Sequence, residues 1–238
     1  LSICNPAIFF FKRAKWKLND VLQKNIAGLQ ILNGAIDTGF NEGMKFRINI
    51  LLKGHHKYIY AGNDAHGNFN IYRQIKIPMV SLYEKKEQIF GQFRTGVYPT
   101  KKNDISTIIK SLKNGNCFVT NAPLLNMTFH SDSSIYDMGS VINVDNGILN
   151  ISIISTPEFG KIKKIVIKMG VIGKRKEIDY FSIMNPKMYE LNKSIEIYVD
   201  SKCYYRCEVK LESQGGNKKF ALTNPIWLSP IIKEDTLN

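Results

Sequence analysis

The segment 60–70, YAGNDAHGNFN, brings together two side chains that could bind a metal ion. It follows an apolar run, turns at Gly62, and places Asp64 and His66 two residues apart, with Gly67 directly after them. A carboxylate oxygen and an imidazole nitrogen are suitable ligands for zinc, manganese or iron. The pair follows a predicted buried strand, where barrel and α/β proteins gather ligands and catalytic groups. We therefore take Asp64 and His66 as candidate metal ligands, with a purely structural role as the alternative.

The first half of the sequence alternates between helical and strand-like patterns. Apolar residues recur at helical spacing in three segments and form short buried runs in two others. The clearest helix is capped by Asp104 or Ser106 and ends at Gly115. Such alternation predicts a parallel sheet or part of a βα barrel. The expected helices are 14–25, 41–56 and 103–115, and the expected strands are 27–34 and 57–62.

The pattern changes after Gly115. Seven strand-like segments follow, most of which alternate apolar and polar residues, and Gly, Asn, Asp or Pro separates them. Short strands at this spacing predict an antiparallel β-sandwich of about 100 residues. The predicted fold class is α/β plus all-β, with residues 1–117 as the α/β domain and 118–238 as the β-sandwich domain. The expected strands are 117–120, 124–130, 147–156, 161–170, 194–200, 204–213 and 220–229.

The net charge of +13 is concentrated in the first half of the chain. Residues 1–120 hold 18 Lys and Arg against 7 Asp and Glu, whereas residues 121–238 hold 15 against 13. A field of this sign favours anionic ligands such as phosphate or nucleic acid. The alternative is a solvated basic surface, because the lysines form no long basic tract. No apolar run approaches the roughly 20 residues that a membrane-spanning helix needs, so we expect no membrane partner.

The four cysteines show no spacing typical of a disulfide framework. Cys203 and Cys207 lie on one predicted strand, where four residues span about 13 Å. A disulfide needs Cα atoms within about 7 Å of each other, so these two cannot bridge on a regular strand. We expect buried free thiols and a reducing, cytoplasmic compartment.

Motifs in the same order along most of the chain resemble those of the PHP (polymerase and histidinol phosphatase) family of metal-dependent phosphoesterases. GNDAHG is similar to the GSDAH metal motif of that family, and GLQILNG to its Gly-Ile-Glu-Ile-x-Asn-Gly strand. No single motif is highly specific, but their succession is. The other matching segments are ICNPAI (3–8), FGQFRTGVY (90–98), LKNGNCFVTNAPLL (112–125) and LTNPIWL (222–228).

The resemblance implies the C-terminal part of a distorted (β/α)7 barrel followed by the β-sandwich. Asp64 and His66 correspond to the last two metal ligands of the family. The implied activity is metal-assisted hydrolysis of a phosphoester, in which clustered divalent ions lower the pKa of a bound water and neutralise charge on phosphate oxygens. Arg94 is the candidate catalytic residue, because a guanidinium can bind phosphate through two hydrogen bonds.

The sequence also departs from the family pattern. The family cluster begins with His-x-His, but the four histidines here make no such motif, and Asn5 stands where the family has His before Pro6. A firmly held catalytic zinc has three protein ligands, so we expect zinc, manganese or iron to be weakly held or absent. Because the chain begins at Leu1 on an apolar segment, we also expect it to start partway into a longer product.

Three functions remain open from the sequence. The first is a PHP-type hydrolase acting on an anionic, phosphate-bearing small molecule. The second is a catalytically inactive descendant that binds a ligand or has a structural role. The third, less favoured, is a basic protein that binds nucleic acid or another polyanion, because only charge supports it. The sequence contains no G-x-S-x-G, Walker A or G-x-G-x-x-G motif.

Overall fold

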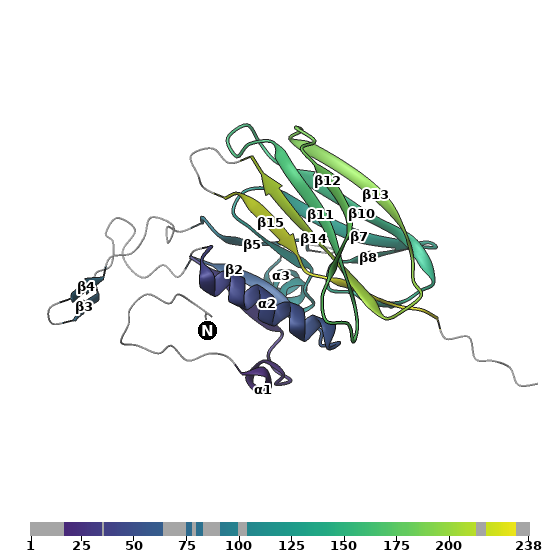
Figure 1. The fold of residues 1–238 in the computed structure, drawn as a ribbon, viewed down its shortest axis with the longest axis horizontal. Helices are drawn as coiled ribbons and strands as arrows, with labels where there is room; N and C mark the ends of the chain where they lie inside the picture. Colours follow the sequence, from purple (N-terminus) through teal and green to yellow (C-terminus); the bar gives the residue numbers. More distant parts are fainter. Residues whose placement is uncertain are drawn as a thin grey trace, which may run out of the picture.

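A computed structural model gives the arrangement of most of the chain (Figure 1). Its helices are α1 (Leu18–Val21), α2 (Thr38–Leu52) and α3 (Ile105–Lys113). Among the residues that the structure describes, no helix has the length and apolar character needed to cross a membrane. The structure describes residues 17–34, 36–63, 91–99, 104–212 and 218–231, and the backbone of 75–77 and 80–82.

The first half contains a βαβ unit, as the alternating pattern predicted. Strands β1 (Gly28–Asn33) and β2 (Tyr58–Gly62) pair in parallel, and α2 connects them. Asp37 caps α2 by accepting a hydrogen bond from the backbone N–H of Phe40 at 3.0 Å. The two strands approach so closely that a Cβ at Gly28 would lie 2.3 Å from the carbonyl oxygen of Tyr58. Glycine is therefore required there. A complete barrel stays a prediction, since β1 and β2 form a sheet of two parallel strands in the described part of the first half.

The second half forms two packed sheets. A four-stranded antiparallel sheet has the order β13-β10-β7-β8, and a larger sheet has the path β12-β11-β14-β15-β6-β5, with β16 and β9 attached beside β14. Apolar residues from both sheets, among them Leu125, Ile151, Ile165 and Cys207, form the main core between them. The predicted β-sandwich is confirmed. The strands of the four-stranded sheet are β7 (Leu124–Ser131), β8 (Ser134–Asp137), β10 (Asn146–Ile154) and β13 (Glu190–Tyr198).

The larger sheet contains strands that the sequence pattern missed. The missed strands are β5, β9 and β12. β5 and β9 are too short for alternation to be visible, and a Cβ at Gly96 of β5 would lie 2.3 Å from the ring of Phe118. β12 is an edge strand of seven residues, none of them buried, so it lacks the apolar alternation of the inner strands. The predicted strand 220–229 is divided in two by Asn224 and Pro225. The strands of this sheet are β5 (Arg94–Val97), β6 (Cys117–Thr120), β9 (Val141–Asn143), β11 (Ile162–Val171), β12 (Ile178–Met184), β14 (Cys203–Leu211), β15 (Phe220–Thr223) and β16 (Ile226–Ser229). A separate hairpin consists of β3 (Ile75–Ile77) and β4 (Val80–Leu82).

The larger sheet also crosses the sequence-based domain boundary. β5 precedes residue 118, yet it pairs antiparallel with β6 from Arg94 and Thr120 to Val97 and Cys117. The predicted first helix, 14–25, is also shorter in the described chain, because a turn replaces the helix after Val21.

The βαβ unit covers the outer face of the larger sheet and makes a third layer (Figure 1). Val119, Phe220 and Leu222 point away from the sandwich core and pack with residues of β1, β2 and α2, including Leu29 and Ile50. Strand β14 is therefore covered on both faces, and seven of its nine residues are buried. Because both faces of β14 are buried, the strand carries large side chains on both sides.

Asn224 joins the βαβ unit to the sandwich. Its side chain is fully buried and accepts a hydrogen bond at 2.8 Å from the backbone N–H of Ile59 in β2. The amide also donates to the carbonyl oxygen of Cys117 in β6 at 3.1 Å. One side chain thus satisfies backbone groups on two strands that do not pair with each other, and buried groups of this kind are costly to leave unpaired.

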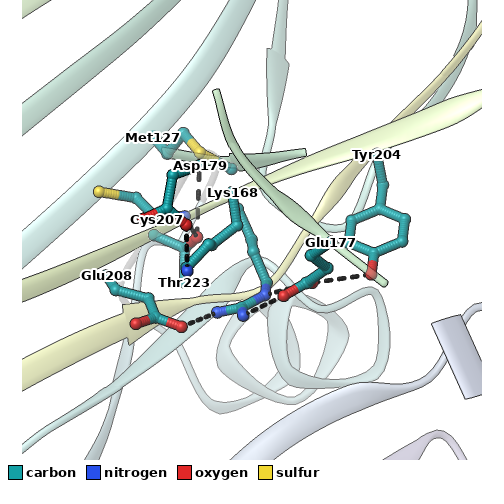
Figure 2. A network of polar contacts seen from close by, with 9 residues as sticks. Met127, Lys168, Glu177, Asp179, Tyr204, Cys207, Glu208 and Thr223 are labelled. Atoms are coloured by element: carbon teal, nitrogen blue, oxygen red, sulfur yellow. Dashed lines mark hydrogen bonds and ion pairs between the residues drawn. The ribbon is translucent and has the colours of Figure 1, made fainter. Parts of the chain in front are cut away.

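A buried ion cluster lies on the face of β14 against which α2 packs, and Figure 2 shows its contacts as dashed lines. The Arg206 guanidinium donates to both carboxylate oxygens of Glu177, at 2.7 and 2.5 Å, and to Glu208 at 2.6 Å. The Tyr204 hydroxyl donates to Glu177 at 2.7 Å. Burial opposes the charge on Glu177, but the hydrogen bonds and charge of Arg206 outweigh it and hold the pKa of Glu177 below its usual value. Each of the three side-chain nitrogens of Arg206 thus has a carboxylate partner.

Arg47 of α2 differs from Arg206 because it is fully buried without a hydrogen bond to any of its three side-chain nitrogens. Burial and then the charge of Arg206 lower the pKa of Arg47 to about 9. The side chain therefore stays charged at neutral pH, and its charge is opposed by desolvation that no direct partner offsets.

Substitution of the two arginines should have opposite effects. We expect Arg47→Met to raise the free energy of unfolding by about 1–3 kcal/mol, because it removes an unpaired buried charge while filling similar volume. Arg206→Met should lower it by about 3–5 kcal/mol, because it leaves the Glu177 carboxylate buried without its partner. Urea denaturation at neutral pH measures both. A less stable Arg47→Met variant would show that Arg47 has partners that balance its burial.

Loss of the Asn224 amide should weaken the attachment of the βαβ unit. We expect Asn224→Ala to lower the free energy of unfolding by about 2–4 kcal/mol, since it leaves buried backbone groups of β2 and β6 unpaired. Asn192→Ala, on the exposed edge strand β13, serves as the control and should stay within about 0.5 kcal/mol of the parent protein. Equal effects of the two substitutions in urea denaturation would exclude this role for Asn224.

Candidate functional site

The predicted metal ligands, Asp64 and His66, lie outside the described residues. The structure does place the chain that leads to them, because β2 ends at Gly62 and Asn63 follows it. Asn33, at the end of β1, is paired in register with Gly62. The carboxyl ends of the two parallel strands therefore lie side by side, and the carboxyl edge of a parallel sheet is where α/β proteins bind ligands.

Polar side chains fix the end of β1 against the end of β2. The Gln30 amide donates to the Asn33 side-chain oxygen at 2.7 Å, and the backbone N–H of Gly34 donates to the carbonyl oxygen of Gly62 at 3.0 Å. A Cβ at Gly62 would lie 2.4 Å from the Gln30 amide nitrogen. Gly62 thus allows the Gln30–Asn33 hydrogen bond to form beside the strand end.

Strand β5 reaches the same end of β2 and carries Arg94. The backbone N–H of Phe93 donates to the Asn63 side-chain oxygen at 2.7 Å. The Thr95 hydroxyl oxygen accepts a hydrogen bond from the N–H of Ala61 at 2.9 Å. These contacts lie on either side of Arg94, whose exposed side chain has no hydrogen-bond partner among the described residues. Arg94 is therefore positioned beside Ala61 and Asn63 at the carboxyl end of β2, and its side chain is exposed and able to contact an anion.

The other histidines lie away from this strand end. The His56 ring packs on Trp227 with centroids 4.6 Å apart, before the amino end of β2. Burial and then the charge of His55 lower the pKa of His56, which favours the neutral ring. His130 lies on β7 and contacts the Thr128 hydroxyl at 3.1 Å. The described ranges contain no group of three or more His, Cys, Asp or Glu side chains that could hold a metal ion.

The described cysteines are buried free thiols, as expected. Burial raises the pKa of Cys117 to about 12 and that of Cys203 to about 11, and it also raises the pKa of Cys207. Because the thiolate is the reactive form, none of the three is a suitable nucleophile at neutral pH.

A polar groove that the sequence gave no signal for lies at the opposite end of β2. Its volume is about 430 Å³, and it lies between Tyr58, the carboxyl end of α3, and the turn that follows β8. Asn116 and Asp137 line it, and partial burial raises the pKa of Asp137. The lining residues come from segments far apart in the sequence, so no local motif could identify them.

Comparison of the chain with protein-family models, with curated proteins and with solved structures gave no match.

The raised pKa of Asp137 predicts a stability that depends on pH. Folding favours the protonated carboxyl, so the contribution of Asp137 to stability is fullest below the ordinary pKa of an aspartate, about 3.9, and is lost as pH rises through the higher folded pKa. The Asp137→Asn variant has no carboxyl group at this position, so it does not lose this stability as pH rises. The melting temperature of Asp137→Asn relative to the parent protein should therefore increase as pH rises from about 3.5 to 6.

The control for this measurement is Asp132→Asn, which removes one carboxylate from the exposed turn before β8. Asp132 has φ of 52°, a conformation that Asn also adopts readily, so the turn should be preserved. If the difference between Asp137→Asn and the parent protein does not change across this pH range, partial burial of Asp137 has no energetic consequence.

Proposed function

We propose that this chain is a metal-dependent hydrolase of the PHP type that acts on phosphoesters. Asp64 and His66 are the proposed metal ligands, and Arg94 is the proposed phosphate-binding residue. The observation that supports this proposal best is the position of Arg94, which contacts on either side hold at the carboxyl end of β2. The fold that goes with it is the C-terminal part of a (β/α)7 barrel, of which β1, α2 and β2 would form one unit, followed by the β-sandwich.

The chemistry of the proposed site depends on which groups meet at the strand ends. A bound divalent ion would supply a water of lowered pKa and charge to balance the phosphate. The chain contributes the exposed guanidinium of Arg94, which can bind two phosphate oxygens and orient the scissile ester. Asn33 and Asn63 are held by Gln30 and by the N–H of Phe93, so they maintain the shape of the strand ends. Buried free thiols are in keeping with an enzyme of the cytoplasm.

The second candidate is a protein that keeps this architecture but binds a phosphate-bearing ligand without hydrolysing it. It is favoured by the lack of a cluster of metal-ligating side chains in the part of the chain that the structure describes. In that case Arg94 would still bind the ligand, and hydrolysis would be missing.

Metal binding is tested by thermal denaturation of the full chain with added manganese or zinc. We expect a small rise in melting temperature, because an ion that binds the folded state stabilises it by mass action. Asp64→Ala and His66→Ala should each remove this rise. If both variants keep the full response to metal, the ion binds elsewhere and the assignment of this turn is wrong.

Phosphate recognition is tested through Arg94. We expect Arg94→Ala to reduce kcat/KM for p-nitrophenyl phosphate in the presence of manganese by about tenfold to a hundredfold, the loss of one or two charge-assisted hydrogen bonds. Its melting temperature should be unchanged, because the side chain is exposed. Arg175→Ala, an exposed arginine between β11 and β12, is the matched control.

The outcomes distinguish the candidates. Hydrolysis by the parent chain that is lost in Asp64→Ala supports the enzyme. Binding of inorganic phosphate that requires Arg94, without any hydrolysis, supports the non-catalytic protein. Equal effects of Arg94→Ala and Arg175→Ala would indicate only the general positive charge of the chain.

A further inference from the structure

The polar groove lies at the junction of the βαβ unit and the sandwich. Its position follows from close backbone contact, because the turn after β8 packs against the end of α3. A Cβ at Gly139 would lie 1.9 Å from the carbonyl oxygen of Asn114, and Gly139 has φ of +88°. The turn therefore requires glycine, and this contact sets one wall of the groove. The polar residues that line it are Tyr58, Lys110, Ser111, Asn114, Asn116, Asp137 and Ser140.

Asn116 holds the Asp137 carboxylate in place. Its side-chain amide donates to the carbonyl oxygen of Tyr98 at 2.8 Å and to Asp137 Oδ2 at 3.1 Å. Asp137 Oδ1 has no hydrogen-bond partner among the residues described. The Asn116 side-chain oxygen is buried without a partner as well. The Asn116 oxygen is out of reach of a ligand because it is fully buried, which leaves Asp137 Oδ1 as the acceptor for a ligand with hydroxyl or N–H groups.

The charge of the groove indicates what kind of ligand it favours. Lys110 and Asp137 are its only ionised side chains, so they balance each other. The chain as a whole carries +13 and repels cationic ligands. A groove without excess positive charge does not select anions. The remaining lining groups are amides and hydroxyls that both donate and accept hydrogen bonds. A neutral ligand rich in hydroxyl groups matches this set.

The outer face of the four-stranded sheet continues the same chemistry. In the register of that sheet Asp137 pairs with Thr128, Thr128 with Asn150, and Asn150 with Ser194. The next row contains Ser152, which pairs with two further asparagines of β7 and β13. A shallow cavity of about 130 Å³ lies over these rows. Apart from Asp137, the two rows carry no charged side chain, although charged residues make up 22% of the chain.

We infer that the groove is a carbohydrate-binding site, in which Asp137 accepts hydrogen bonds from sugar hydroxyls and the row through Thr128 and Asn150 contacts the next sugar unit. The size of the groove is suitable, because clefts of about 300–1,000 Å³ bind small molecules through a few fixed polar groups. The groove lies at the amino end of β2, whereas the proposed metal ligands follow its carboxyl end in the sequence. The inference therefore does not depend on the proposed hydrolase.

Saturation-transfer NMR with the full chain tests this inference, using maltose, cellobiose, lactose and chitobiose at millimolar concentration as probes. We expect saturable transfer to at least one of them. Asp137→Asn should weaken that binding about tenfold or more. The Asn side chain keeps one oxygen to accept from Asn116, but its NH2 group, which is a donor, replaces the Oδ1 acceptor that a sugar hydroxyl would contact. Asp132→Asn should bind as the parent chain does. Circular dichroism and the melting temperature establish that both variants are folded.

Three outcomes would overturn the inference. The first is the lack of transfer to all four disaccharides, and the second is transfer that Asp137→Asn leaves unchanged. The third is binding of spermidine that is lost in Asp137→Asn while no disaccharide binds, because the groove would then select a cation. Asn150→Ala provides a further check. If the second sugar unit lies over the sheet, Asn150→Ala should weaken binding of the disaccharide and leave binding of its monosaccharide unchanged.

Discussion

The arrangement of both halves of the protein depends on the buried amide of Asn224. Strand β2 pairs with β1 on one edge, and its other edge faces β6 and β5 without forming a regular ladder with them. Asn224 and Thr95 supply the missing partners for its backbone N–H groups at Ile59 and Ala61. Because unpaired backbone groups are expensive to bury, these two side chains fix β2 against the sandwich. They thereby position the carboxyl end of β2, next to Arg94, and the polar groove at the opposite end of the strand.

The larger sheet can be covered on both sides because its central strands are apolar on one face and mixed on the other. On β14 the inner face carries Cys203, Tyr205 and Cys207, whereas the outer face carries Tyr204 and Arg206. The outer face meets α2, so its charges must be satisfied without water. Arg206 achieves this by binding two carboxylates, one of them through two hydrogen bonds. Arg47 on the facing helix has no such partner among the described residues. The same interface thus contains a well-compensated buried charge and a poorly compensated one.

Local pattern predicted most of the long elements because it records how each segment divides its faces between core and solvent. The exception is β12, an edge strand of seven residues with no buried residue. β7, β10 and β11 were expected from alternation, and α3 from its apolar stripe and the Asp104 cap, which accepts from the N–H of Thr107 at 2.7 Å. β5, β8 and β9 have three or four residues each. They are strands because neighbouring strands supply their partners, and no pattern within three or four residues can show that.

The sequence by itself determined the change from an α/β half to a β-sandwich half, and it singled out Asp64, His66 and Arg94 as residues able to bind metal and phosphate. Side-chain type and strand periodicity are local properties, so they can be read along the chain. Only the tertiary structure decided that Arg94 lies beside the end of β2, and that Asn116 and Asp137, 21 residues apart, share one groove with Tyr58. The reason is physical: a site of this kind is made by hydrogen bonds and close packing between distant segments, and these form only when the layers of the fold come together.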